Sequence, residues 1–286
     1  MERILFGDNQ FFGVNHMSEE KARAQAMMFR DTNAIMRVLD YAYSIGIKVF
    51  MCTTHDQVAE IVDVVRAHPE KYADFEFYPC MPYALKYANS VGEVGVVETL
   101  RRFAPGGIVE TLFRGAMSAA TQDLDKLMHL LVDAELKRFA GVKTPIVFIQ
   151  NVVTDLMLGL KQGAALADFA HYVRERHHAE AGFITMNMPM LVDALDGAGL
   201  RNPIVCANIN KIGFRMSGGI EAYKALLQSK RCRSIAMSVF ASGAIPAKEA
   251  IDWVCGLEGL DAIVFGASSH GNIRQTKQLI EEAWAR

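Results

Sequence analysis

Short polar loops that follow apolar runs carry most of the chemically capable side chains in this sequence. The apolar run 262–265 leads into a small, polar loop made of Gly266, Ala267, Ser268 and Ser269. A helix is predicted over 271–284, so backbone N–H groups of this loop lie at a helix N-terminus, where anions bind readily. Arg274 lies one helical turn onward and could contact the same anion. The segment predicts a phosphate site, with a turn that only closes the fold as the alternative.

Lys211 offers a second kind of chemistry, because it follows the apolar run 203–209. A lysine that is removed from water loses its charge near neutral pH and can attack a carbonyl carbon to form a Schiff base. Tyr78, Tyr83 or His55 would then transfer protons. This interpretation predicts a lyase or aldolase without a nicotinamide cofactor. A solvated lysine or a phosphate ligand is the alternative.

A third kind of chemistry would use a metal ion held by Asp8, His16 and His55. Asp8 and His16 follow the first apolar run, and His55 follows the second. Three nitrogen or oxygen ligands with an open position suit a catalytic metal. No H-x-H or H-E-x-x-H spacing supports such a site. The main interpretation therefore contains no metal and keeps Asp8, His55, Tyr83 and Lys211 as catalytic candidates.

Side-chain amides are frequent among the residues that follow the apolar runs. Each amide donates and accepts hydrogen bonds, which suits a carbonyl compound or a polyhydroxylated ligand. We therefore predict a polar pocket for a small molecule that is polyhydroxylated or, given the phosphate loop, anionic. The candidate substrate-binding residues are Asn9, Gln10, His16, Gln150, Asn151, Asn187, Asn208 and Asn210.

The order of the segments predicts the scaffold that brings these side chains together. Apolar runs alternate with longer segments of helical periodicity, the pattern of parallel β/α units, whose strands are buried on both faces. A (β/α)8 barrel needs about 250 residues, so we expect residues 1–286 to form a single TIM-barrel domain. Extra helices are predicted after the first strand, at 18–29, and after the third, at 91–104. The predicted strands are 3–6, 47–51, 75–81, 145–150, 182–187, 203–209, 234–239 and 262–265.

Composition narrows the class of protein further. The chain has 286 residues, a formal net charge of −2 and no long run of Lys or Arg, so we expect no nucleic-acid partner. No apolar stretch reaches membrane-spanning length, so no membrane partner is expected. The five cysteines are widely spaced without a C-x-x-C pair, which predicts free thiols in a reducing, cytoplasmic compartment. Cys52 could act as a nucleophile beside His55, but a buried thiol is the preferred interpretation.

Three segments resemble the aldo-keto reductases. Residues 234–284 resemble the end of that family's barrel, where a strand, a Gly-Ala-Ser loop and a helix hold the phosphates of NAD(P). Residues 121–151 look like its long helix and fourth strand, and residues 42–54 resemble its Gly-Ile-x-x-Phe-Asp-Thr-Ala second strand. The resemblance implies a (β/α)8 barrel that binds NADP or NAD. Its cofactor-binding residues would be Gly266, Ala267, Ser268, Ser269 and Arg274.

The family's four catalytic residue types, an Asp, a Tyr, a Lys and a His, are missing from the matching positions. In that order, those positions hold Met51 or Cys52, His55, Pro79 to Met81, and Gln150 with Asn151. The family's mechanism therefore does not transfer to this chain. The resemblance implies a divergent member with a replaced proton donor, for which His55 or Tyr83 is the best substitute.

These observations predict an enzyme that acts on a small polar carbonyl compound or a sugar-like metabolite. Its expected activity is that of an aldo-keto-reductase-like, NAD(P)-linked oxidoreductase. The alternatives are a lyase or aldolase that uses Lys211 and a non-catalytic barrel that binds a ligand.

Overall fold

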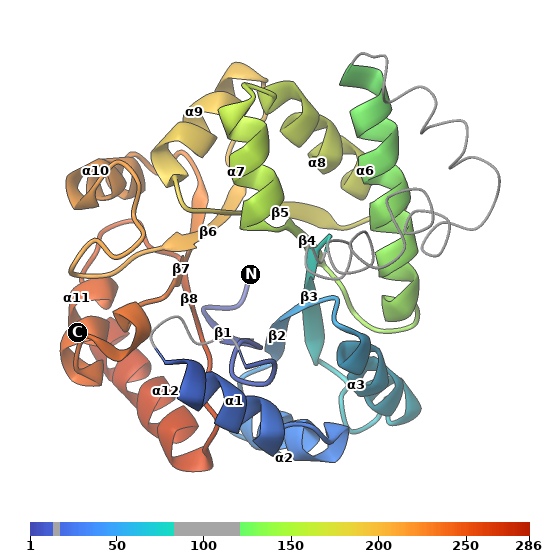
Figure 1. Ribbon diagram of the computed structural model, residues 1–286. Helices are drawn as coiled ribbons and strands as arrows, with labels where there is room; N and C mark the ends of the chain where they lie inside the picture. The colour runs from blue at the N-terminus through green and yellow to red at the C-terminus, as the bar shows by residue number, and fades with distance from the viewer. Residues whose placement is uncertain (14–17, 83–120) are drawn as a thin grey trace.

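Eight parallel strands close into a barrel in the computed structural model, which describes residues 1–13, 18–82 and 121–286. Each strand pairs with the next along the chain, and the last pairs with the first (Figure 1). The predicted (β/α)8 TIM-barrel fold is confirmed. The strands are β1 (Ile4–Gly7), β2 (Val49–Thr53), β3 (Glu76–Met81), β4 (Ile146–Ile149), β5 (Glu180–Thr185), β6 (Ile204–Asn208), β7 (Arg233–Met237) and β8 (Ala262–Phe265).

Successive strand residues point alternately into the barrel and outward to the helices, which divides the core into two clusters. Met51, Cys80 and Cys206 belong to the inner cluster. Phe148 fills so much of this space that a Cβ at Gly182 would lie 2.2 Å from its ring. The barrel is therefore packed with side chains, and a ligand meets the protein at the strand ends.

The helices surround the barrel, and several of them begin at a side chain that accepts a hydrogen bond from a free backbone N–H group. Asp31, for example, accepts a 3.0 Å hydrogen bond from the backbone N of Asn33 at the start of α2. The helices are α1 (Glu19–Met28), α2 (Thr32–Ser44), α3 (Asp56–Ala67), α6 (Thr121–Leu136), α7 (Asn151–Gly159), α8 (Gly163–His177), α9 (Met188–Gly197), α10 (Ile220–Ser229), α11 (Ala247–Cys255) and α12 (His270–Trp284), with the 3-10 turns η1 (Lys137–Phe139) and η2 (Ala241–Gly243).

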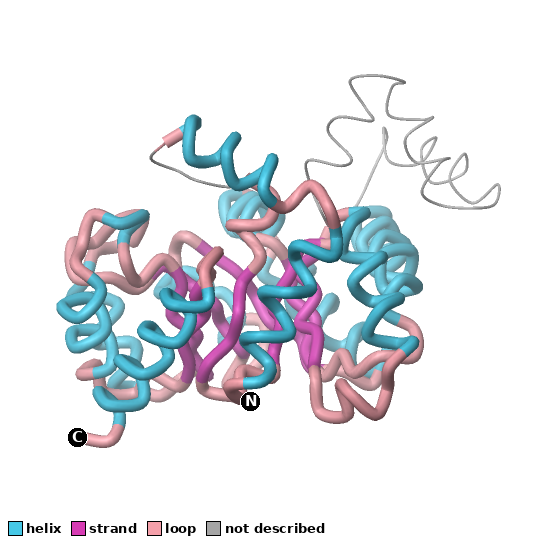
Figure 2. Tube along the Cα trace, turned by 90° about the horizontal axis from the view of Figure 1, so that it is seen from below, coloured by secondary structure: helices cyan, strands magenta, loops and turns pink. Residues whose placement is uncertain are grey.

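Two helices depart from the simple alternation of strand and helix. Helix α1 is the extra helix predicted after the first strand, and Figure 2 shows it outside the ring, at the end opposite the two termini. Helix α7 lies between β4 and α8 and was not predicted. The extra helix predicted over 91–104 falls outside the described residues.

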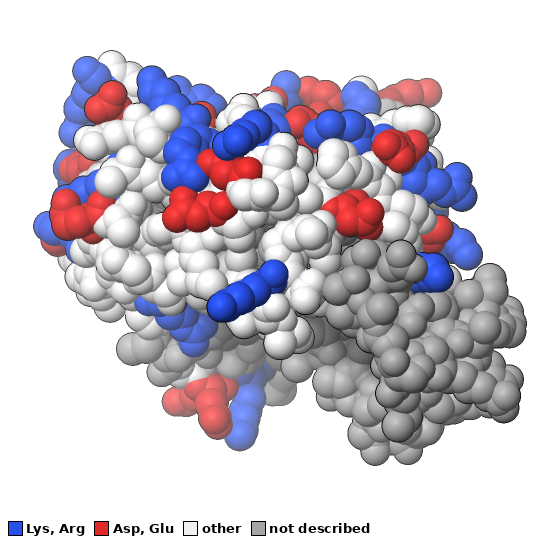
Figure 3. Space-filling view, turned by 90° about the horizontal axis from the view of Figure 1, so that it is seen from above, with Lys and Arg blue, Asp and Glu red and all other residues white. Residues whose placement is uncertain are grey.

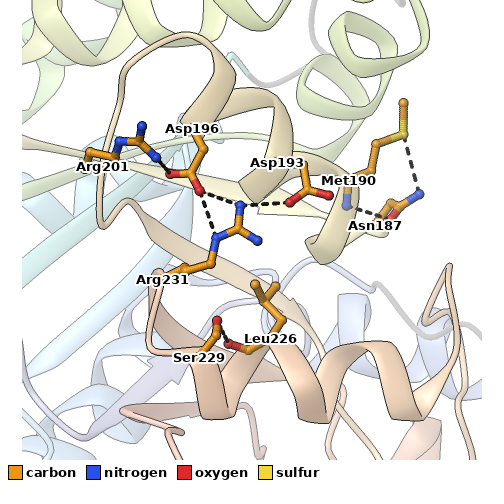
Figure 4. A network of polar contacts seen from close by, with 8 residues as sticks. All are labelled: Asn187, Met190, Asp193, Asp196, Arg201, Leu226, Ser229 and Arg231. Atoms are coloured by element: carbon orange, nitrogen blue, oxygen red, sulfur yellow. Dashed lines mark hydrogen bonds and ion pairs between the residues drawn. The ribbon is translucent and has the colours of Figure 1, made fainter.

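At the N-terminal ends of the strands, charged contacts tie the helices together. The Arg3 guanidinium lies 4.0 Å from the ring centre of Trp284 in α12. Arg231 donates 2.8 Å hydrogen bonds to Asp193 and to Asp196 of α9 (Figure 4). The hydrogen bond from Arg231 lowers the pKa of Asp196. Because exposed ion pairs contribute little free energy, these contacts mainly fix the positions of the helix ends.

The outer surface carries charges of both signs. Figure 3 shows Lys and Arg interspersed with Asp and Glu on the face where α7, α8 and α9 lie, with no large area of a single sign on that face. This mixture agrees with the net charge of −2. No helix of the described residues is both long and apolar enough to cross a bilayer.

Candidate functional site

The carboxylate of Asp8 joins the C-terminal ends of β1 and β2. Its Oδ2 accepts hydrogen bonds of 2.7 Å from both the backbone N and the Oγ1 of Thr53. Asp8 is buried, and desolvation raises its pKa while the two bonds from Thr53 act in the opposite direction. A buried carboxyl group at strand ends is a typical acid–base candidate. Thr53 was not among the predicted site residues. The signal for it in the sequence is a hydroxyl-bearing residue directly after an apolar run.

Gln10 connects the first strand to the predicted anion loop. Its Nε2 donates a 2.8 Å hydrogen bond to the carbonyl of Gly7, which fixes the orientation of the amide. Its Oε1 is buried and has no donor among the described residues. This oxygen lies only 2.0 Å from the position that a Cβ at Gly266 would take. Gln10 therefore brings an unpaired acceptor to the start of the loop, where buried polar atoms normally have partners.

The loop from Gly266 to Ser269 leads directly into helix α12. Ser269 caps that helix by accepting a 3.3 Å hydrogen bond from the backbone N of Asn272. The N–H groups of His270 and Gly271 have no acceptor in the part of the chain that the structure describes. Gly266 and Ser269 are exposed, and Ala267 and Ser268 are half-buried. The loop therefore offers accessible donors to an anion.

The charges around this loop also favour an anion. Arg274 is exposed and forms no ion pair with any described residue. The residues from 266 to 274 contain no Asp or Glu. His270 stacks on Tyr41 of α2, with ring centres 4.0 Å apart, which holds the start of α12 against its neighbour.

Two of the predicted amides face the mouth of the barrel. Gln150 and Asn208 lie two residues beyond Phe148 and Cys206 of the inner cluster, so the strand alternation turns them toward the barrel axis. Gln150 Nε2 donates to the carbonyl of Cys80 over 3.2 Å, and Asn208 Nδ2 donates to the carbonyl of Arg215 over 3.1 Å. Neither amide oxygen accepts a hydrogen bond from the described residues. Gln150 is half-buried and therefore presents an acceptor at the mouth, whereas Asn208 is 1% exposed and its amide is enclosed.

The other predicted amides have different surroundings. Asn210 is fully buried, donates to the carbonyl of Phe214 over 2.9 Å and accepts from its backbone N over 2.8 Å. Its amide is thus used within its own loop, which contradicts the predicted contact with substrate. Asn187 caps α9 by accepting a 3.3 Å hydrogen bond from the N of Met190 (Figure 4). Asn9 is exposed, and Asn151 begins α7.

Lys211 lies at the surface. Its Nζ is 2.7 Å from Oε1 of Glu249 on α11, and 44% of its side chain is exposed. A Schiff-base lysine needs burial that suppresses its charge, whereas Lys211 is exposed and its Nζ contacts a carboxylate. The structure therefore contradicts the premise on which Lys211 was predicted as a nucleophile.

His55 caps helix α3 with its ring. Its Nδ1 accepts a 3.2 Å hydrogen bond from the backbone N of Gln57, so in the neutral ring the proton resides on Nε2. The ring stacks on Phe12, with ring centres 4.3 Å apart. The described residues contain no cluster of His, Cys, Asp or Glu that could hold a metal ion. His16 and Tyr83, which were predicted with His55, lie outside the described residues.

The end of β2 places Met51 and Cys52, the two residues left open by the resemblance to the reductase strand, on opposite faces of the strand. Met51 faces the barrel interior, Cys52 packs among the outer cluster, and the strand continues to Thr53. Cys52 is completely buried, and burial raises its pKa well above the usual value. Cys52 is therefore a buried thiol, in agreement with the preferred interpretation.

Asp155 of α7 was missed in the sequence. Its carboxylate accepts a 2.5 Å hydrogen bond from Oγ1 of Thr185 and a 3.1 Å bond from the backbone N of Met186. Partial burial raises its pKa. The bonds attach α7 to the end of β5. The only local signal was an acidic residue in a short amphipathic segment directly after a strand.

Comparisons with known proteins identify the fold. No family model matches the sequence, and no curated protein matches it. A solved protein of Pseudomonas aeruginosa assigned to the aldo-keto reductases has a TM-score of 0.62 and 12% identity, over 99% of this chain and 90% of that one. Aldose reductase from Giardia lamblia has a TM-score of 0.52 and 11% identity, over 99% and 90%.

A variant of the protein Gox0644, solved in complex with NADPH, has a TM-score of 0.53 and 9% identity, over 98% of this chain and 83% of that one. At such identities the similarity extends to the fold alone. Together with the closed parallel barrel, it shows that this chain has the fold of the aldo-keto reductases.

Proposed function

We propose that this chain is an NAD(P)-linked oxidoreductase that reduces a small polar carbonyl compound. The observation that carries the proposal is the start of α12, where the unengaged N–H groups of His270 and Gly271 lie one turn before the unpaired Arg274. A dinucleotide phosphate fits this donor set in charge and hydrogen bonding. NADPH bound to a protein of the same fold makes the nicotinamide cofactor the natural occupant.

The cofactor would be held at Gly266 to Ser269 by its phosphates and would supply a hydride to the substrate carbonyl. Gln10 packs against this loop, because its amide fills the space next to Gly266. The side-chain oxygen of the half-buried Gln150 would accept a hydrogen bond from a hydroxyl group of a polyhydroxylated substrate. This contact would orient the carbonyl group in the mouth.

His55 is the best candidate for the proton donor among the described residues. Its capping bond through Nδ1 leaves the proton on Nε2, and its stacking on Phe12 restricts the ring. A positioned imidazole can protonate the oxygen of the substrate as charge develops there. Asp8, whose pKa is raised by burial, provides a second acidic group near the ends of β1 and β2.

Cofactor binding is tested by titrating the protein with NADPH and following the cofactor's fluorescence. We expect saturable binding that weakens about tenfold or more in Arg274→Ala, since a charge-assisted phosphate contact is lost. Lys277→Ala is the matched control, because Lys277 lies on the same helix and already pairs with Glu281. Absence of binding at millimolar NADPH, or equal affinity in both variants, would reject the cofactor site.

Catalysis is tested with glyceraldehyde as the carbonyl substrate and NADPH oxidation as the signal. The variant His55→Asn keeps an oxygen that can cap α3 but removes the imidazole proton. We expect turnover to fall by about 100-fold or more while NADPH affinity is unchanged. If NADPH binds without turnover of glyceraldehyde or other small hydroxyaldehydes, the barrel is a ligand-binding protein instead.

A further inference from the structure

A cavity of about 360 Å³ lies at the opposite end of the barrel from the Gly266 loop. It is bordered by the end of α6, by η1 and the chain leading into β4, and by the end of α8. These segments precede strands β4 and β5, so they belong to the N-terminal ends of the strands. The volume falls within the range of about 300–1,000 Å³ that small-molecule pockets occupy.

The walls of this cavity combine an apolar floor with cationic side chains. Leu136, Phe139 and Val147 form the floor and are between 0% and 8% exposed. Lys137 of η1 and Arg176 of α8 both line this cavity. Neither forms an ion pair with any residue that the structure describes. Both charges can therefore pair with a ligand.

Asp133 is the one acidic side chain among the described residues that line the cavity, and its charge is already engaged. Its Oδ1 accepts a hydrogen bond from Tyr172 Oη at 2.7 Å and contacts His177 Nε2 at 2.8 Å. Burial, together with the bond to Asp133, raises the pKa of Tyr172 to about 12, so the hydroxyl group remains a donor. The side of the cavity formed by α6 and α8 therefore does not repel an anion strongly.

Aromatic stacking fixes this side of the cavity. His129 of α6 lies flat on Tyr172 of α8, with ring centres 3.7 Å apart, and its Nε2 is 2.7 Å from Oδ2 of Asp168. The two helices are thus joined by two His–Asp contacts with a tyrosine between them. A ligand would meet a pre-formed wall, which lowers the entropic cost of binding.

We propose that this cavity binds a small organic anion, with its carboxylate or phosphate group held by Lys137 and Arg176 and its apolar body on Leu136, Phe139 and Val147. The guanidinium of Arg176 suits the paired oxygens of such a group, and Lys137 adds a point charge. The site is separate from the proposed cofactor cradle and does not depend on reductase activity. The protein would thus bind a second ligand at the N-terminal ends of the strands, opposite the candidate functional site.

Calorimetric titration of the full chain with benzoate and with phenyl phosphate tests the site. We expect saturable binding of at least one probe, weakened about tenfold or more in Lys137→Met and in Arg176→Met. Arg174→Met is the matched control, since Arg174 is an exposed arginine of α8 that does not line the cavity. Thermal unfolding of each variant establishes that it is folded.

Two further arms distinguish binding in this cavity from binding at the Gly266 loop or at scattered surface cations. Arg274→Ala should leave the binding of both probes unchanged, because Arg274 belongs to the other end of the barrel. Inorganic phosphate should bind at least tenfold more weakly than phenyl phosphate, because it cannot use the apolar floor. The proposal is overturned if neither probe binds at millimolar concentration, if Arg174→Met weakens binding as much as Arg176→Met, or if inorganic phosphate binds as well as phenyl phosphate.

Discussion

Gln10 occupies the space that a side chain at position 266 would need. The Oε1 of Gln10 lies 2.0 Å, and its Cδ 2.9 Å, from the Cβ that an alanine at Gly266 would carry. Gln10 is itself 6% exposed and bonded to the carbonyl of Gly7. A larger residue at position 266 would therefore have to displace the end of the Gln10 side chain, where β1 and β8 meet and the barrel closes.

Gly266→Ala is expected to destabilise the protein by about 1–3 kcal/mol, because overpacking must displace the buried amide of Gln10. Removing the obstacle should reverse the effect, so the double variant Gln10→Ala with Gly266→Ala should recover most of the loss. Urea unfolding of the two single variants and the double variant measures this coupling. Additive effects of the two substitutions would show that the residues do not compete for space.

The titration of Asp8 should appear in the pH dependence of stability. Because burial raises its pKa in the folded state, folding favours the neutral carboxyl group. The contribution of Asp8 is therefore most favourable below the usual Asp pKa of about 3.9, and it declines as the pH rises through the raised value.

Asp8→Asn removes this titration while keeping an oxygen that can accept from Thr53. We expect the variant to gain stability relative to the unchanged protein as the pH increases from about 4 to about 8, as measured by urea unfolding. Asp63→Asn is the control, because Asp63 is exposed. A constant difference between the Asp8 variant and the parent across this range would contradict the effect of burial.

The strands could be predicted from the sequence because their burial on both faces leaves continuous apolar runs. Their ends were harder to place, since Cys52 and Thr53 of β2 lie where the apolar pattern stops but the pairing with β3 continues. The contact between Gln10 and Gly266 joins distant parts of the chain and depends on barrel closure. Likewise, the ion pair of Lys211 is made with Glu249 of α11, which lies far from it in the sequence. Such relationships come from tertiary packing and leave no local signal.

Lys211 should not form a Schiff base at neutral pH. Its side chain is exposed and its Nζ pairs with Glu249, so the burial that a Schiff-base lysine needs is missing. Treatment with glyceraldehyde and borohydride, followed by intact mass and peptide mapping, should show no preference for Lys211 over other exposed lysines, and Lys211→Ala should retain any reductase activity. A single stoichiometric adduct that disappears in Lys211→Ala would instead establish the lyase chemistry.

The thiols provide a test of the whole packed core. Four of the five cysteines, Cys52, Cys80, Cys206 and Cys232, are buried, and Cys255 is half-buried. Burial raises the pKa of Cys255 to about 11 and that of Cys232 to about 12. Since the thiolate is the reactive form, the four buried thiols should react slowly in the folded protein, and the half-buried Cys255 should react faster than they do.

Titration of the folded chain with a chromogenic disulfide at mildly alkaline pH should therefore detect at most one fast-reacting thiol, that of Cys255, and all five after denaturation. Cys255→Ser should abolish the fast phase and leave the slow one. Rapid modification of Cys52 in the folded protein would contradict its burial in the outer cluster of the core. It would also restore Cys52 and His55 as a candidate nucleophile and base.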